Sequence, residues 1–339
     1  MNMKNAGFRT AGSGWSRRRV LKSGAVVAAG AALTMPLHAA AYPDRLIRFV
    51  VPFPAGGTGD VFVRTVGQHL SEAFGQSVIV ENRPGASTII GTQQVVRAPA
   101  DGYTLLATSS SLATLPVISR KLAFDVVKDL RPVVMPVHLP VVIASDPEAP
   151  FSSFREMVAY AKANPGKLTV GVSPGQASVS RFVMEMLKQQ AGVNVVIVPY
   201  AGGAAVTTAL LARDIQCLVD AVPASAPFIK AGKMRGLAVL TPQRMAGMPD
   251  IPTVVESGMP DLVVDTWFGI LAPAGMPDDV VARLHKEITA ITARPDVREK
   301  FLSLGMEPVS LTSEQFAESI ARAVGTWTRV ARDANLQFD

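Results

Sequence analysis

Residues 51–61 read V-P-F-P-A-G-G-T-G-D-V, and they directly follow the apolar run I-R-F-V at residues 47–50. A β-rich run, a glycine-rich turn and a helical pattern in this order predict a strand that leads through a loop into a helix. The amides at the start of such a helix carry about half a positive charge and can bind an anion. The stretch therefore predicts an anion-binding turn, either for a nucleotide or for a smaller anion.

The turn lacks the residues that nucleotide loops require. A dinucleotide loop needs G-x-G-x-x-G, but the G-T-G of residues 57–59 is followed by D-V-F and has no third glycine. A P-loop needs lysine after its last glycine, and Asp60 in that place would repel a polyphosphate. With Asp60 as the expected N-cap, the turn suits a compact anion such as a carboxylate. The alternative is a structural turn in which Asp60 only caps the helix.

Short β-rich runs alternate with amphipathic helical patterns along most of the chain, which predicts an α/β fold built from parallel units. The predicted strands are 47–51, 78–81, 104–108, 141–144, 168–172, 195–198, 216–220, 237–240 and 263–268. The predicted helices are 61–74, 154–163, 179–190, 206–212, a run opened by Pro277, and a run from a capping-box-like start at Ser313 to about residue 334.

Two extended segments, 132–150 and 267–273, suggest that the chain crosses twice between two domains. We therefore expect a discontinuous lobe 1 of residues 42–142 and 266–339, with lobe 2, residues 143–265, inserted into it.

The motif of the opening turn occurs twice. V-P-F-P-A-G-G at 51–57 is echoed by V-P-Y-A-G-G at 198–203, and the loop 171–178 has the same place between a strand and a helix. In open α/β sheets ligands bind beyond the carboxyl ends of the strands, so these three loops are candidate site loops. Hydroxyl groups at 108–111 add hydrogen-bond donors that suit a carboxylate.

The first 41 residues differ from the rest of the chain. They carry six basic and no acidic residues, then the apolar stretch 25–33 and A-A-A at 39–41. This order predicts a cleavable export signal, with an uncleaved amphipathic anchor as the alternative. S-R-R-R-V-L-K at 16–22 fits the twin-arginine pattern. Because these six residues equal the net charge of +6, the predicted mature chain is neutral, and we expect it in the periplasm.

The composition argues against several classes of function. Without the leader no basic stripe with aromatic residues remains, so we expect no nucleic-acid partner. Cys217 is the only cysteine and allows no intramolecular disulfide. His69, His138 and His285 lie far apart without other ligands at metal spacing, so we expect no metal and no other cofactor.

One motif points to an enzyme. The G-V-S-P-G of residues 171–175 matches the nucleophile elbow G-x-S-x-G, and a later aspartate and His285 complete the order Ser, Asp, His. An exported serine hydrolase that uses Ser173 is therefore an alternative. Two features argue against it: Pro174 has no N–H for an oxyanion hole, and His285 falls within a helical pattern.

Ordered motifs run through residues 42–339. They are Y-P at 42–43, the turn at 51–60, E-N-R-P-G-A at 81–86, D-G-Y-T-L-L at 101–106, V-P-Y at 198–200, I-P-T-V-V-E-S-G at 251–258 and W-F-G-I-L-A-P-A-G at 267–275. In these motifs the chain resembles the Bug receptors, the extracytoplasmic solute-binding proteins of tripartite tricarboxylate transporters.

The resemblance implies a two-lobed periplasmic binding protein of type II-like fold, with mostly parallel sheets flanked by helices and joined by two crossing strands. It implies a monomeric, non-enzymatic receptor that closes on a small carboxylate and delivers it to membrane transporter subunits; a sensor for a signalling partner is a further alternative. The implied ligand-binding residues are Phe53, Ala55, Gly56, Gly57, Thr58, Asp60, Ser109, Ser110, Ser173, Gly175, Ser178, Tyr200, Gly202 and Asp220.

The chain departs from the family pattern at two positions. Ser180 is followed by Arg181 where the family commonly has histidine, and Ala201 replaces a lysine in the second turn. If Arg181 faces the cleft, its guanidinium can pair with a second ligand carboxylate; the alternative is an exposed helix arginine.

Overall fold

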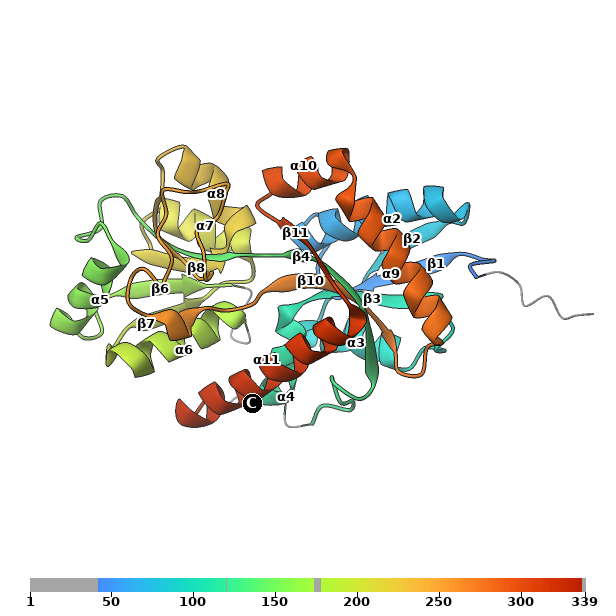
Figure 1. Cartoon of the computed structure of the whole chain (residues 1–339). Coiled ribbons are helices and arrows are strands. Elements are labelled where there is room, and N and C mark those ends of the chain that lie inside the picture. Colours follow the sequence, from blue (N-terminus) through green and yellow to red (C-terminus); the bar gives the residue numbers. More distant parts are fainter. Residues whose placement is uncertain (1–41, 120, 174–177, 337–339) are drawn as a thin grey trace, which may run out of the picture. The chain divides into compact units, whose positions relative to one another are not determined.

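A computed structural model of the chain describes residues 42–119, 121–173 and 178–336 (Figure 1). The chain divides into two units, Met1–Tyr42 and one that begins at Pro43, and the helices and strands of the described residues all lie in the second. The predicted export signal, residues 1–41, lies outside the described residues.

One sheet has six strands in the order β11-β4-β10-β3-β1-β2. Strand β1 is parallel to β2 and β3, whereas β10 is antiparallel to β3 and β4, and β11 is antiparallel to β4. The strands are β1 (Ile47–Val51), β2 (Val78–Asn82), β3 (Thr104–Ser109), β4 (Leu130–His138), β10 (Trp267–Pro273) and β11 (Glu307–Leu311).

The other sheet has five strands in the order β7-β6-β8-β5-β9. Strand β6 is parallel to β7 and β8, whereas β5 lies antiparallel between β8 and β9. The strands are β5 (Val141–Ser145), β6 (Thr169–Val172), β7 (Val196–Pro199), β8 (Cys217–Ala221) and β9 (Arg235–Val239).

Helices flank both sheets (Figure 1). We call the six-stranded sheet with its helices lobe 1, and the five-stranded sheet with its helices lobe 2. Lobe 1 has α2 (Thr58–Phe74), α3 (Ile89–Val96), α4 (Leu115–Ile118), α9 (Asp278–Ala293), α10 (Pro295–Ser303) and α11 (Ser313–Asp333), with the 3-10 turns η1 (Ala86–Thr88) and η2 (Ser110–Thr114). Lobe 2 has α5 (Phe154–Ala163), α6 (Val179–Ala191), α7 (Gly203–Leu211) and α8 (Val222–Lys230), and the turn η3 (Pro260–Leu262) precedes the return to lobe 1.

Two crossing segments join the lobes. The chain leaves β4 through Leu139 and enters β5 two residues later, and it returns through Thr266 into β10. The Leu139 N–H donates to the Thr266 carbonyl at 2.8 Å, so the two segments are hydrogen-bonded to each other where they pass between the sheets. The predicted two-lobed α/β fold with two crossings is confirmed.

The prediction of mostly parallel sheets is wrong, because only four of the nine strand pairings in the described residues are parallel. The reason is the crossing itself. A chain that enters a lobe from its neighbour runs in the direction opposite to the local βα units, so β5 and β10 pair antiparallel with them. The division of the chain by residue number remains a prediction, although the boundary after residue 142 falls inside β5.

Two strands of lobe 1 were not predicted, and one was misplaced. Strand β4 is an interior strand, paired between β11 and β10, although it contains Pro132 and Pro136, which argue against an interior strand. Irregular register on both sides of β4 accommodates them. Strand β11 was also missed. The predicted strand 263–268 in fact begins at Trp267, because the residues before it form the second crossing.

The last helix shows how local sequence sets a helix start. Thr312 accepts a hydrogen bond from the Gln315 N–H, and the Gln315 side chain bonds back to Thr312, which forms a complete capping box. The predicted cap, Ser313, is instead the first helical residue, and its hydroxyl bonds the Pro132 carbonyl of β4.

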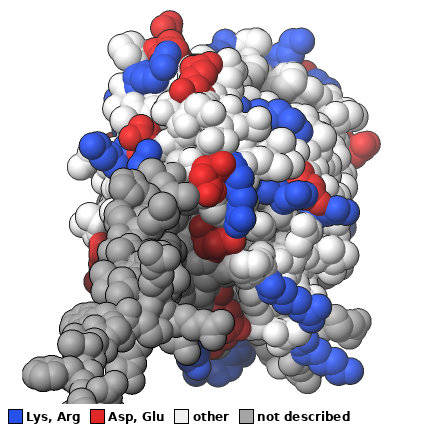
Figure 2. Space-filling model, turned by 90° about the vertical axis from the view of Figure 1, so that its right-hand side faces the viewer, with Lys and Arg blue, Asp and Glu red and all other residues white. Residues whose placement is uncertain are grey.

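Charges of both signs are interspersed on the face of lobe 1 shown in Figure 2. Charged side chains of lobe 1 also form ion pairs, such as Arg45 with Asp101 at 2.8 Å. Among the helices of the described residues, none is both long and apolar enough to pass through a bilayer.

Candidate ligand-binding site

A cavity of about 490 Å³ lies between the lobes. Both lobes and both crossing segments contribute to its wall. The lining residues are Phe53 to Gly59 and Ser109 to Ser111 from lobe 1; Ser173, Val179, Ser180, Ala201 to Ala204, Asp220, Ala221 and Ala224 from lobe 2; and Leu139, Val141 and Thr266 to Phe268 from the crossings. In each lobe these residues follow the carboxyl ends of parallel strands, where ligands of α/β proteins bind.

The opening turn forms one side of the cavity, and Asp60 holds it in shape. Asp60 is only 4% exposed and accepts hydrogen bonds from the Gly56 N–H, from Arg64 and from the Asn82 amide, each at 2.9 Å. The Asn82 amide also donates to the Phe53 carbonyl. Burial alone would raise the pKa of Asp60, but these three hydrogen bonds lower it below its usual value.

Asp60 was predicted to be the N-cap of this helix, and that prediction is wrong. Gly57 is the N-cap of α2 and no side chain caps it, whereas Asp60 lies in the first turn. The carboxylate reaches back to the Gly56 amide and leaves the amides of Thr58 and Gly59, at the open end of the helix, without intrahelical acceptors. Both residues line the cavity, and their amides can donate to an anion there.

Four further helical segments begin at the cavity, among them α8, which starts after Ala221 without a side-chain cap. Helix α7 starts at Gly203 without a side-chain cap, while α6 and η2 start after Ser178 and Ser109, whose hydroxyls accept from the amides of their own first turns. Each start adds partial positive charge to the wall. Uncapped starts in both lobes, α2 and α7, leave amides on opposite sides of the cavity that can bind an anionic ligand.

Among the described residues that line the cavity, Asp220 is the only ionisable one. Its Oδ1 accepts from the Ser173 hydroxyl and from the Ala221 N–H, both at 2.8 Å, and its Oδ2 is buried without a hydrogen-bond partner in the described parts of the chain. Burial raises the pKa of Asp220 to about 6, and the two hydrogen bonds oppose this rise. A methyl group on Gly203 would lie 2.6 Å from Oδ2, so only glycine fits at the start of α7.

Aromatic rings from lobe 1 and a crossing segment form an apolar part of the wall. Phe268 packs edge-on against Phe53 at 6.2 Å and stacks on Phe62 at 5.6 Å. Trp267 packs edge-on against Phe316 of α11 at 4.7 Å. Such a surface suits the carbon skeleton of a small molecule, while the helix starts bind its charged group.

Ten predicted site residues line this cavity: Phe53, Ala55, Gly56, Gly57, Thr58, Ser109, Ser110, Ser173, Gly202 and Asp220. Gly175 lies outside the described residues. Four others are described but do not line the cavity: Asp60, Ser178, Arg181 and Tyr200.

Each of these four has a structural role. Asp60 shapes the first turn and Ser178 caps α6. Arg181 lies along α6, where Glu185 binds its guanidinium at 2.8 Å, and the Tyr200 ring packs beside Gly171 in lobe 2. Because Glu185 is four residues after Arg181, this pair follows from helical spacing alone.

The predicted site residues did not include those that the crossing segments contribute, Leu139, Val141 and residues 266–268, or those at the start of α8, Ala221 and Ala224. A signal for the first group was present, because W-F-G was already part of a predicted crossing. In a two-lobed protein the crossings form the floor of the cavity. Small residues at the start of α8 carry no comparable signal.

The structure does not support the hydrolase alternative. Ser173 donates to Asp220, and the described residues that line the cavity include no histidine. His285 lies on α9 in lobe 1, with its Nε2 2.9 Å from the Leu311 carbonyl.

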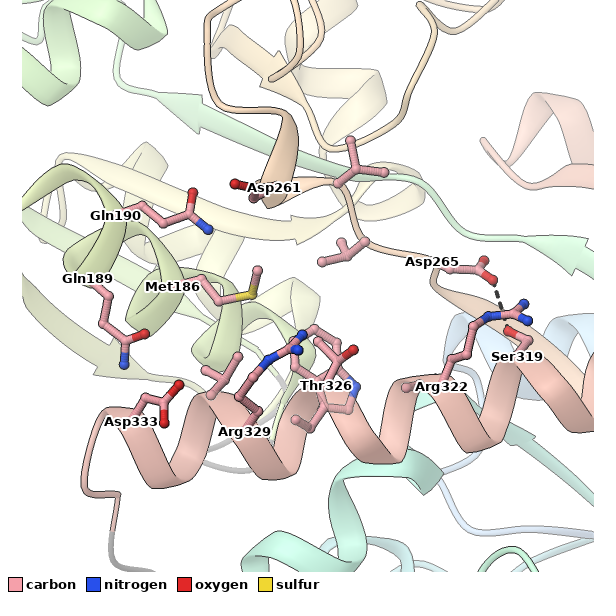
Figure 3. A pocket seen from close by; sticks show the side chains of 15 residues that line it. Met186, Gln189, Gln190, Asp261, Asp265, Ser319, Arg322, Thr326, Arg329 and Asp333 are labelled. Carbon is pink, nitrogen blue, oxygen red and sulfur yellow. Dashed lines mark hydrogen bonds between the residues drawn. The ribbon is translucent and has the colours of Figure 1, made fainter.

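A second cavity, of about 530 Å³, shares no residue with the first. It lies between α6, residues 261–265 and α11 (Figure 3). Arg322 and Arg329 line it together with Asp261, Asp265 and Asp333, so charges of both signs are present. This mixture does not select an anion or a cation.

His138 and Asp265 form an ion pair beside the crossings, with the Nδ1 of His138 2.9 Å from Oδ1 of Asp265. Burial alone would lower the pKa of His138, but Asp265 raises it above 6.5. Burial alone would raise the pKa of Asp265, but His138 lowers it below 3.8. The stabilisation of the fold by His138 is complete below pH 6.5 and is lost as the pH rises through the folded pKa of His138. The stabilisation by Asp265 is present above pH 3.8 and is lost as the pH falls through the folded pKa of Asp265.

The ion pair of His138 and Asp265 should therefore stabilise the fold most between pH 3.8 and pH 6.5. We expect His138→Gln to lower the free energy of unfolding by about 0.5 kcal/mol near pH 5.5 and by less near pH 9, because both side chains are partly exposed. Urea unfolding at the two pH values measures this difference. An equal loss at both would show that the pair does not stabilise the fold through its charge.

Two α/β lobes around a shared cavity, with uncapped helix starts on both sides, define a solute-binding protein. A family model described as "Tripartite tricarboxylate transporter family receptor" matches residues 62–336, and the chain belongs to this family. The family is one of solute-binding receptors rather than enzymes, and its members are extracytoplasmic.

Relatives and solved structures agree with this assignment. The chain is 36% identical to a UPF0065 protein of Bordetella bronchiseptica over 90% of this chain and 91% of that protein, and 32% identical to BugT of Bordetella pertussis over 94% and 98%. It is similar in structure to Rpa4515 of R. palustris with adipate, with a TM-score of 0.78, 30% identity and coverage of 87% and 98%. It is also similar to MatC of Rhodopseudomonas palustris with malate, with a TM-score of 0.75, 26% identity and coverage of 85% and 99%.

Proposed function

We propose that this protein is a periplasmic receptor that captures a small carboxylate in the cavity between its lobes and delivers it to the membrane subunits of a tripartite tricarboxylate transporter. One observation carries the proposal: the uncapped starts of α2 and α7 line one cavity from opposite lobes. The structures of relatives with adipate and malate support carboxylates as the ligand class.

The geometry explains how binding is coupled to a change of shape. A ligand that accepts hydrogen bonds from both helix starts interacts more strongly with a closed arrangement of the lobes than with an open one. Binding therefore shifts the population toward the closed form. In this proposal only the closed form presents the surface that docks on the transporter, and the receptor acts as a monomer.

We also infer that residues 1–41 direct export by the twin-arginine route, because the S-R-R-R-V-L-K pattern precedes a short apolar core. The inference requires that the mature protein be recovered from the periplasm, with an N-terminus near Tyr42.

A thermal-shift screen of the mature protein against organic acids, amino acids and aromatic carboxylates tests the function. A ligand present at about 100 times its Kd adds about 2.7 kcal/mol to the free energy of unfolding, so at least one carboxylate should raise Tm by several degrees. The Gly203→Ala variant should lose the shift, because its methyl group would lie 2.6 Å from Asp220 and 2.9 Å from Ala224. Gly247→Ala is the matched control, since nothing lies within 4 Å of its added methyl group. If no carboxylate raises Tm, the proposed function is wrong.

A further inference from the structure

Ser173 and Asp220 form a buried hydrogen-bonded pair in the wall of the cavity. They meet because β6 and β8 are parallel neighbours with Val172 opposite Val219, so the residues that follow lie side by side. Both are at most 6% exposed, and both line the cavity. The Ser173 hydroxyl donates to Asp220 Oδ1 at 2.8 Å, and the Ala221 N–H donates to the same oxygen.

The direction of the Ser173 hydrogen bond is the same in either protonation state of Asp220. An ionised carboxylate only accepts hydrogen bonds. If Asp220 is protonated, the proton belongs on Oδ2, because the Ala221 N–H already occupies Oδ1 and Oδ2 has no partner among the described residues. Ser173 therefore remains the donor and Asp220 Oδ1 the acceptor.

This direction decides what Ser173 can offer a ligand. A hydroxyl group has one proton and two lone pairs. Because Asp220 takes the proton, only the lone pairs remain for a ligand. We propose that Asp220 fixes Ser173 as a hydrogen-bond acceptor toward the cavity, and that this site selects a carboxylate whose second polar group is a donor, such as an amide, rather than a second ionised carboxylate. The inference rests on the proposed function, because it concerns the ligand of the same cavity.

The surrounding charges do not offset this preference. The elements that pack against β8 are β5, β6, α6, α7 and α8. Of these, β5, β6 and α7 have no ionisable side chain. On α6, Arg181 and Lys188 both pair with Glu185, and on α8 Lys230 is exposed at the end of the helix. A second carboxylate beside Ser173 would thus face lone pairs and Asp220. Lys230, the cation of these elements that has no ion pair among the described residues, lies at the end of α8 away from Asp220.

Matched pairs of ligands test the preference. Calorimetry near pH 7.5, where aliphatic carboxylic acids are ionised, compares succinate with succinamate and adipate with adipamate. Each monoamide keeps the length of its partner and replaces one carboxylate by a donor. We expect the monoamide of the pair that fits to bind about tenfold more tightly, because the dicarboxylate leaves the acceptor unpaired.

Three variants separate the role of the hydrogen bond from that of the charge. Ser173→Ala removes the acceptor and should reduce the preference for the monoamide to about twofold or less. Asp220→Asn removes the charge but keeps an oxygen that can accept from Ser173, so a preference should remain. Asp220→Ala frees the Ser173 proton and should weaken or reverse the preference. Thr208→Ala is the matched control, because the Thr208 hydroxyl bonds the Ala204 carbonyl and does not line the cavity.

The outcomes distinguish this inference from the proposed function. Dicarboxylates that bind as tightly as their monoamides, or a preference that Ser173→Ala leaves unchanged, overturn the inference and leave the receptor function intact. If none of the four compounds binds, the result counts against both.

Discussion

Replacing Asp60 by alanine should lower the free energy of unfolding by about 2–4 kcal/mol and weaken ligand binding at least about tenfold. Asp60 is buried and accepts three hydrogen bonds, from the Gly56 amide, Arg64 and Asn82. Without the carboxylate, the Gly56 and Asn82 donors lose their acceptor. The turn that presents the amides of α2 then has no fixed shape. Urea unfolding and calorimetry with a carboxylate found in the screen measure the two effects.

Arg64→Ala is the matched control for the Asp60 prediction. The Arg64 side chain is 51% exposed, so the loss of its ion pair with Asp60 should cost under about 1 kcal/mol. Its removal leaves the hydrogen bonds to Gly56 and Asn82 in place. If Asp60→Ala is no more harmful than Arg64→Ala, Asp60 does not hold the turn.

Replacing Trp327 by alanine should lower the free energy of unfolding by about 3–5 kcal/mol. Trp327 is 4% exposed on α11 of lobe 1, and its ring packs against Phe182 of α6 in lobe 2, with 5.5 Å between the centroids. The substitution removes a large apolar contact between the lobes and leaves a cavity in its place. Urea unfolding measures the loss, and small-angle scattering of the free protein should show a more open mean arrangement.

Trp327→Phe retains most of the apolar contact and should cost clearly less than the alanine variant. Thr328→Ala provides a surface control on the same helix, because its exposed hydroxyl bonds only the Val324 carbonyl. A loss below about 1 kcal/mol in Trp327→Ala would show that this contact between the lobes contributes little.

Local patterns in the sequence predicted most of lobe 2 and the first turn of lobe 1. Strand β1 and helix α5 were predicted with the bounds that the structure shows. Strand β1 is a short, mostly apolar run, whereas α5 has apolar residues at helical spacing, and Ser153 caps α5 by accepting from the Glu156 N–H. Strand β4 was missed because its prolines contradict the local rule, and only its pairing with β10 and β11 overrides that rule.

Local patterns also predicted some of the residues that line the cavity. Glycine and serine loops after strands could be recognised one by one, and ten of their residues do line the cavity. The full role of Asp60 could not be recognised, because its hydrogen bond with Asn82 depends on β2 lying beside β1. The pairing of Arg181 with Glu185 required only helical spacing, and the prediction overlooked it.

The sequence by itself determined the alternation of strands and helices, the two crossings and the glycine-rich turn without a third glycine or a lysine, since each depends on neighbours along the chain. The tertiary structure decided which loops meet. It also decided which hydrogen-bond donors and acceptors of these loops remain available for a ligand. Asp220 and Ser173 lie 47 residues apart, and only the parallel pairing of β6 with β8 joins them. That contact commits the serine proton to Asp220, because a carboxylate buried without a cation must be bound by the donors that the fold brings to it.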